Sequence, residues 1–148
     1  MSGYSPELEE AVRYAAEKNV IMVAASGNDG ADTFYYPAAF SQVIGVGAVE
    51  KDGQAASYTE QNSSTLITAP GTSLTAAGHT SDKAVVTKSG SSYAASYVTS
   101  AIALALEMEP GLTLPEIQEG LTESASFTQS PYPVLNVEKF LEYYAFPS

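Results

Sequence analysis

The spacing of hydrophobic residues changes along the first third of the chain, which predicts a helix followed by buried strands. Residues 8–18 repeat apolar side chains at helical spacing, and residues 5–7 (Ser-Pro-Glu) are typical of a helix N-terminus. Residues 20–25 are apolar at every position, which predicts a strand buried on both faces. Residues 43–49 form a second buried run, and its two glycines indicate that other backbone comes close to this strand.

Shorter apolar runs and further helical patterns follow. Residues 66–69 predict a third strand and residues 84–86 a fourth. Residues 92–108 are rich in alanine and small on all sides, which predicts a helix packed tightly at the centre of the fold. Thr113 begins a capping box, and Asn136 caps a last amphipathic helix. The side chains of that helix expected to face inward are Val137, Phe140, Leu141 and Tyr144.

The alternation of helices with apolar strands predicts a single α/β unit with a mainly parallel sheet over residues 1–148. The chain has 6 basic and 17 acidic residues, a formal net charge of −11, which argues against nucleic-acid binding. No apolar run approaches the ~20 residues that a membrane span needs. Because cysteine is absent and His79 is the only histidine, we expect no cofactor and no histidine or thiolate metal site.

Residues 90–96 (Gly-Ser-Ser-Tyr-Ala-Ala-Ser) place serines at the start of the alanine-rich helix. A helix N-terminus presents unpaired N–H groups and favours negative charge. A serine at this position can attack a carbonyl carbon while its own N–H stabilises the oxyanion that forms. The same segment also fits Ser91 or Ser92 as an ordinary helix cap, so on its own it leaves both interpretations open.

Several motifs along the chain occur in an informative order. Residues 24–30 (Ala-Ala-Ser-Gly-Asn-Asp-Gly) follow a buried strand, and residues 90–96 open a helix. In residue type, order and spacing the chain resembles the subtilisin-like serine peptidases (subtilases). That family has an oxyanion loop of the form A-A-x-G-N-x-G and a nucleophile motif G-T-S-x-A-x-P. The resemblance extends from about Glu7 to Tyr143, and its further landmarks are residues 36–37, 43–49, 69–71 and 134–137.

The resemblance implies a role for four residues. Ser92 takes the position of the nucleophile, and its backbone N–H would be one oxyanion donor. Asn28 takes the position of the side chain that supplies the other donor, although a local turn contact is the alternative for an asparagine in such a loop. Ser26 and Gly27 would line the pocket for the substrate side chain that precedes the scissile bond. The implied fold is the C-terminal half of a subtilisin-like catalytic domain, with a central helix starting near Ser92.

The resemblance also shows which parts of the family's site are absent from residues 1–148. The Asp and His of the triad belong to the N-terminal half in this family, and neither of their motifs occurs here. His79 matches no histidine motif and is expected on a surface loop. Further departures from the nucleophile motif are Ser91, Tyr93, Ser96 and Tyr97. Without a base the serine stays protonated, so the chain alone is expected to be inactive.

Three functions remain open at this point. The first is part of a serine endopeptidase that cleaves peptides or proteins through an acyl-enzyme once an N-terminal half completes it. The second is a non-catalytic pseudopeptidase used as a binding or scaffold module, and the third is a generic acidic interaction domain. A homodimer or a complex with a complementary half is expected, because half a sheet leaves open edges and apolar surface. The family implies a secreted or cell-surface bacterial location.

Overall fold

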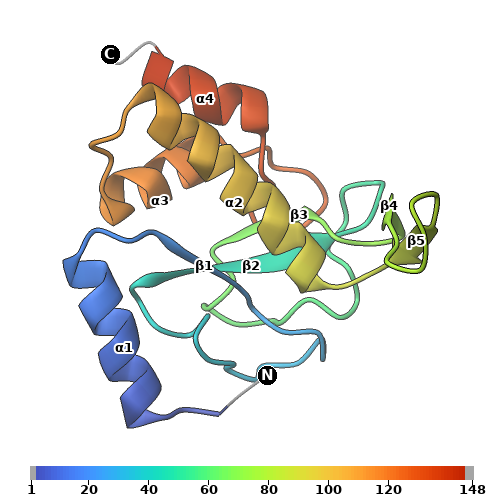
Figure 1. Cartoon of the computed structure of the whole chain (residues 1–148), viewed down its shortest axis with the longest axis horizontal. Helices are drawn as coiled ribbons and strands as arrows, with labels where there is room; N and C mark the ends of the chain where they lie inside the picture. The colour runs from blue at the N-terminus through green and yellow to red at the C-terminus, as the bar shows by residue number, and fades with distance from the viewer. Residues whose placement is uncertain (1–2, 146–148) are drawn as a thin grey trace.

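The computed structural model describes residues 3–145, in which helices and strands alternate (Figure 1). In chain order the elements are α1 (Pro6–Glu17), β1 (Met22–Ala25), β2 (Val43–Val49), β3 (Ile67–Pro70), β4 (Leu74–Ala77), β5 (Val85–Lys88), α2 (Ser91–Met108), α3 (Leu114–Glu123) and α4 (Val137–Ala145). No helix within residues 3–145 is long and apolar enough to cross a membrane. The predicted α/β architecture is confirmed.

The central sheet consists of three parallel strands in the order β1-β2-β3. Gly47 of β2 lies opposite Thr68 of β3. On its other side, Thr68 forms a parallel bridge with Val134, and its N–H donates to the carbonyl of Pro133 at 2.8 Å. The segment before α4 therefore covers the outer edge of β3.

The strand β2 is the middle of the core. All seven of its residues are buried, and the alternate positions Ile44, Val46 and Ala48 pack in one cluster with α2. The buried positions of α2 are mostly small, which lets the helix lie close to the strands. Figure 1 shows α2 crossing the sheet, with α3 and α4 near its C-terminal end. The central position predicted for the alanine-rich helix is confirmed.

The opposite face of β2 explains the two glycines of this strand. A Cβ atom on Gly45 would lie 1.7 Å from the carbonyl oxygen of Ser64, and one on Gly47 would lie 2.6 Å from Cγ2 of Thr59. The segment 59–65 therefore lies directly against the strand, and the predicted close approach of backbone is confirmed.

The predicted helix caps form as expected. Oγ of Ser5 accepts a hydrogen bond from the N–H of Leu8 at 3.3 Å, and Oδ1 of Asn136 accepts one from the N–H of Lys139 at 3.1 Å. Thr113 forms the capping box that begins α3. These caps satisfy N–H groups that have no partner inside their own helix.

The structure corrects the prediction for residues 20–25. The strand β1 spans Met22–Ala25, is half-buried at all four positions, and is preceded by Val20, whose side chain is 48% exposed. Within residues 3–145, β1 pairs with β2 alone. An apolar run identifies the strand, but its burial on the second side depends on a neighbour that these residues do not supply.

Other differences concern boundaries and one pairing. The third strand is Ile67–Pro70, and α2 begins at Ser91. The fourth predicted strand is β5, which pairs antiparallel with β4 in a hairpin that the sequence did not predict. Val137 is 38% exposed, because the first turn of α4 lies at the surface, whereas Phe140 is fully buried as expected. Leu141 and Tyr144 are half-buried against the core.

Candidate active site

The N-terminus of α2 lies at the carboxyl end of the central sheet. Gly90 precedes the helix with φ = +150°, a conformation that favours glycine, and its N–H donates to the carbonyl of Gly71 at 2.8 Å, directly after β3. Gly90 is therefore the N-cap, and neither serine has that role. Ser91 at the first helical position is fully buried, whereas Ser92 is exposed.

The loop after β1 reaches the same end of the sheet. The N–H of Ser26 donates to the carbonyl of Val46 at 2.9 Å, so the loop leaves the sheet one residue beyond the strand. Asn28 follows and is exposed. The carboxyl ends of parallel strands are where α/β folds bind ligands, so the geometry agrees with a site here.

The backbone N–H and the hydroxyl of Ser91 connect this loop to α2. The backbone N–H of Ser91 donates to Oδ1 of Asn28 at 2.8 Å. The hydroxyl of Ser91 lies 2.9 Å from the same Oδ1 and 2.7 Å from the carbonyl oxygen of Gly27. An amide N–H can only donate, so the oxygen of the Asn28 side chain faces Ser91 and its Nδ2 hydrogens remain available to another acceptor.

The arrangement can stabilise a negatively charged oxygen beside Ser92. The N–H of Ser92, at the second position of α2, has no acceptor within its own helix, and a helix N-terminus favours negative charge. The Nδ2 group of Asn28 is a second donor in the same neighbourhood. The structure thus brings Asn28 to the helix that carries Ser92.

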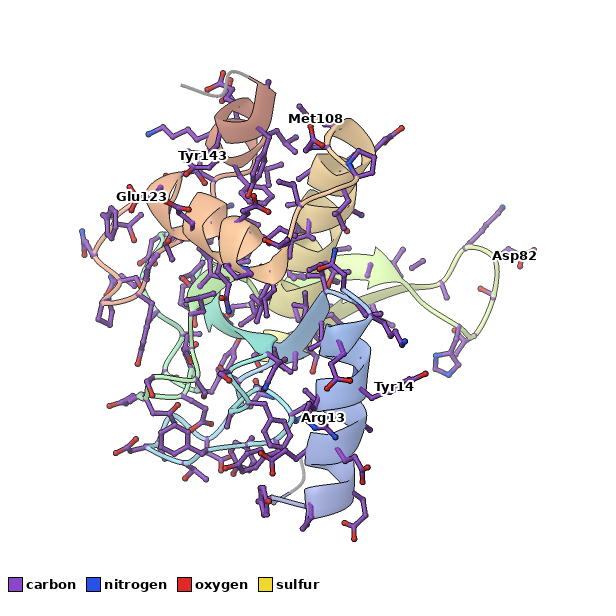
Figure 2. All side chains as sticks on the ribbon, turned by 90° about the vertical axis from the view of Figure 1, so that its left-hand side faces the viewer. Arg13, Tyr14, Asp82, Met108, Glu123 and Tyr143 are labelled. Atoms are coloured by element: carbon purple, nitrogen blue, oxygen red, sulfur yellow. The ribbon has the colours of Figure 1, made fainter. Side chains whose placement is uncertain are left out.

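His79 does not belong to this site. It is exposed in the loop between β4 and β5, and Figure 2 shows Asp82 of that loop at the outer end of the hairpin. The four residues of β5 span about 13 Å of extended chain between this loop and α2. A general base must lie about 3 Å from the hydroxyl it deprotonates. Residues 3–145 therefore place no histidine beside Ser92.

The predicted pocket residues Ser26 and Gly27 are both buried in this structure. Gly27 has φ = +147°, and a Cβ atom there would lie 2.4 Å from Oε1 of Glu60. A cavity of about 420 Å³ lies elsewhere, near the amino ends of β2 and β3, and its lining includes Phe34, Phe40 and Leu66. The two residues thus lie beside Asn28, but they do not line that cavity.

Acidic side chains near the loop do not gather into a metal site. No group of three or more His, Cys, Asp or Glu side chains within residues 3–145 is arranged to hold a metal ion, and Asp29, Asp32 and Asp52 do not form one. Tyr35 donates its hydroxyl hydrogen to the carboxylate of Asp29, and this hydrogen bond raises the pKa of Tyr35. Asp29 therefore has a partner within its own loop.

Sequence reasoning missed two residues at this site. The sequence indicates Ser91 only as a possible helix cap and as a departure from the nucleophile motif, although its side chain and N–H hold Asn28 in place. Glu60 lies in a polar run of the sequence, and nothing in that run indicates that its side chain is fully buried behind Gly27. The position of Glu60 depends on tertiary packing and has no local sequence signal.

The chain is similar to known proteins along most of its length. Residues 1–140 match the model of the Subtilase family. The chain is 33% identical over 127 residues to the thermostable alkaline protease of Halalkalibacterium halodurans, covering 86% of this chain and 35% of that protein. It is 38% identical over 120 residues to the extracellular serine proteinase of Thermus sp., covering 80% of this chain and 29% of that protein. It is 33% identical over 122 residues to subtilisin BL of Lederbergia lenta, covering 82% and 45%.

The fold is similar to a solved structure as well. The prenylagaramide maturation protease PagA superposes with a TM-score of 0.83 and 26% sequence identity, over 96% of this chain and 56% of that chain. The chain therefore spans less than half the length of these curated relatives, at 29–45%, and about half of the solved structure.

Proposed function

The chain belongs to the subtilase family, and from this premise we propose that it is the part of a serine endopeptidase domain that carries the nucleophile and the oxyanion donors. Its substrates are peptides or proteins. The observation that carries the proposal is the hydrogen bond from the backbone N–H of Ser91 to Oδ1 of Asn28. It orients Asn28 so that its Nδ2 group is free to donate beside the exposed Ser92.

The reaction that this arrangement supports is acyl transfer. Oγ of Ser92 attacks the carbonyl carbon of the scissile peptide and forms a bond to it, while the hydroxyl proton passes to a base. The N–H of Ser92 and Nδ2 of Asn28 donate hydrogen bonds to the oxyanion. The C–N bond then breaks and the amine leaves with a proton. Water hydrolyses the acyl-enzyme by the same steps and restores the serine.

The base and the carboxylate that orients it come, in this proposal, from a second segment or chain. Within residues 3–145 two surfaces are uncovered and suit such a partner. One is the unpaired edge of β1. The other is the outer side of α2, where Tyr97, Leu104 and Met108 are 44%, 46% and 47% exposed. The relatives are more than twice as long as the part that this chain matches, so we assign these surfaces to the rest of the catalytic domain. A second copy of the chain is the alternative partner.

The proposed location is outside the bacterial cell or at its surface. Its support is the similarity to proteins named as extracellular, the serine proteinase of Thermus sp. and the minor extracellular protease Epr of Bacillus subtilis.

The test uses the longest form in which the protein is encoded, together with the 148-residue chain. The longer form should hydrolyse a peptide anilide and react with a fluorophosphonate probe at Ser92, and Ser92→Ala should abolish both. Ser96→Ala, an exposed serine one turn along the same helix, is the matched control and should retain both. Asn28→Leu should lower kcat by about 10²–10³-fold, a range measured in subtilisin, a member of this family, and carried over from it.

The second candidate function is a non-catalytic binding module. It is favoured by the departures Ser96 and Tyr97 in the nucleophile motif and by the exposed position of the single histidine, His79. If the longest form binds peptides but neither hydrolyses them nor reacts with the probe, this second function replaces the first.

A further inference from the structure

Glu60 is a fully buried acid that the proposed mechanism does not use. The single ion pair within residues 3–145 joins Arg13 to Glu17 on the surface of α1, so no basic side chain of this part of the chain pairs with Glu60. Burying a carboxyl group costs free energy unless hydrogen bonds compensate. The contacts of Glu60 with neighbouring backbone therefore determine whether it is stable at this position.

Glu60 packs against the backbone on both sides of Asn28. Its Oε1 atom accepts a hydrogen bond from the N–H of Asp29, the residue after Asn28, at 2.8 Å. Its side chain also occupies the space that a side chain at position 27 would need, since a Cβ atom on Gly27 would lie 2.4 Å from Oε1 and 2.5 Å from Cγ. The side chain of Glu60 therefore contacts the backbone at both residues that flank Asn28: it packs against Gly27 and accepts a hydrogen bond from Asp29.

The segment around Glu60 holds the rest of the same loop. The N–H of Gly30 donates to the carbonyl of Tyr58 at 3.0 Å, and the N–H of Gln61 donates to the carbonyl of Ala31 at 2.7 Å. The side-chain amide of Gln61 adds a bond to the carbonyl of Gly30 at 2.9 Å. Of these contacts, the bond from Asp29 to Glu60 is the one nearest to Asn28 in the chain.

Ser91 holds Asn28 from the other side. It bonds to the carbonyl of Gly27 and to Oδ1 of Asn28. Asn28 thus lies between two anchors, a serine on α2 and the carboxyl group of Glu60. A donor that stabilises a transition state must be held in place before the reaction, and a displacement of about 1 Å can cost on the order of 100-fold in rate.

We infer that Glu60 is a positioning residue, which holds the backbone at Gly27 and Asp29 so that Nδ2 of Asn28 points toward the oxyanion. This inference rests on the proposed function. Glu60 acts through Asn28 and does not touch the substrate. A carboxyl oxygen of Glu60 accepts the Asp29 N–H, and glutamine keeps an acceptor oxygen of the same shape.

The first test uses the 148-residue chain and does not depend on activity. Amide hydrogen exchange followed by NMR should show the N–H of Asp29 exchanging at least 10-fold faster in Glu60→Ala, while the N–H of the buried Ile102 in α2 is unchanged. The N–H resonance of Ser91, which bonds to Asn28, should shift in the same variant. Glu60→Gln should restore both readouts to within about threefold of the wild type. Gln61→Ala removes a contact to the same loop one residue away and is the matched control, with Asp29 protection retained.

Two results would overturn the inference. One is an unchanged Asp29 exchange rate in Glu60→Ala. The other is a parallel increase at Asp29 and Ile102 in both Glu60 variants, which indicates a merely structural role. If Glu60→Ala does not fold, Gly27→Ala decides, because its Cβ atom must displace the Glu60 side chain. Retained Asp29 protection in a folded Gly27→Ala variant contradicts the inference.

The second test uses the longest encoded form. Glu60→Ala should lower kcat by about 10–100-fold with little change in KM, and Glu60→Gln should recover most of the loss. An effect confined to KM would contradict positioning of an oxyanion donor. If the wild-type longest form has no activity, the proposed function fails, and the exchange measurements still decide whether Glu60 holds Asn28.

Discussion

Oδ1 of Asn28 accepts a hydrogen bond at 2.8 Å from the backbone N–H of Ser91, 63 residues further along the chain. The Ser91 hydroxyl shares its one hydrogen between the carbonyl of Gly27 at 2.7 Å and the same Oδ1 at 2.9 Å. The residue beside the proposed nucleophile therefore orients the side chain that would bind the oxyanion. The hydroxyl of Ser92 takes no part in these bonds.

The Ser91→Ala variant should lower the free energy of unfolding by about 1–3 kcal/mol. Among residues 3–145 it removes the only side-chain donor to the carbonyl of Gly27, a buried residue, and a buried acceptor without a partner costs about this much. Urea denaturation measures the change. Ser96→Ala, whose hydroxyl bonds within its own helix at an exposed position, is the control and should stay within about 0.5 kcal/mol of the wild type. Equal losses in the two variants would contradict the anchoring role of Ser91.

Gly120→Ala should destabilise the chain, although alanine is the better helix former by about 1 kcal/mol. Gly120 lies within α3, where an added Cβ atom would be 2.2 Å from the hydroxyl oxygen of Tyr144 and 3.3 Å from Cε2 of Phe140. Overpacking of this kind costs about 1–3 kcal/mol, so the steric effect exceeds the gain in propensity.

A double-mutant cycle checks this explanation for Gly120. Tyr144→Phe removes the hydroxyl that the new methyl group meets, so the double variant should lose less than the sum of the two single losses. Thermal denaturation of the four proteins gives the coupling. Strict additivity would show that the Tyr144 hydroxyl is not what excludes a side chain at position 120.

Stability above pH 10 should depend on Tyr144. Burial is the main cause that raises the pKa of Tyr144 to about 12, and the nearby Tyr143, Glu116 and Glu119 raise it further. A raised pKa means that folding favours the neutral phenol. The contribution is fully present below the unfolded pKa of about 10 and is lost as the pH rises from 10 toward 12. Between these values the stability of Tyr144→Phe should fall less steeply than that of the wild type. Identical slopes in denaturation series would contradict the assignment.

Much of the fold was predictable because its signals are local. The run 43–49 is apolar at every position and forms β2 with the same boundaries, and Ser5, Thr113 and Asn136 cap helices through atoms only three residues away. These features depend on neighbours in the sequence. The features that the sequence did not predict depend, in contrast, on contacts between residues far apart in the chain.

The exposure of β1 and the burial of Glu60 show why the rest was not predictable. An apolar run looks the same whether one or two strands flank it, so residues 20–25 predicted a burial that β1 does not have. Glu60 is buried because the loop at Gly27 closes over it, which no property of its own segment indicates. The candidate site residues Asn28 and Ser92 were identified through motif resemblance. The contacts of Ser91 and Glu60 with the Asn28 loop were identified only from the structure.

The chain should associate in solution, and the outer side of α2 should contribute. Tyr97, Leu104 and Met108 are each more than two-fifths exposed there, and Figure 2 shows Met108 at the outer end of the helix. Burying apolar area contributes roughly 25 cal/mol per Å². Leu104→Glu should therefore shift the sedimentation profile toward monomer. Val85→Glu, at a more exposed position on the β4–β5 hairpin, is the control and should leave the profile unchanged.

Salt should strengthen this association. The chain carries a formal net charge of −11, so two copies repel each other, and salt screens exposed charges beyond about 8–10 Å. A monomer at all protein and salt concentrations would contradict the prediction. An unchanged sedimentation profile for Leu104→Glu would show that the outer side of α2 is not part of the interface.

The bridge between Thr68 and Val134 limits how the central sheet can grow. A sheet with two open edges can add molecules at both sides without end and form fibres. Here the segment before α4 occupies the β3 side, so the described part of the sheet can accept a new strand only beside β1. Once two copies have joined through that side, neither has a further free edge in this sheet. Pairing between copies through this sheet is therefore self-terminating and stops at two molecules.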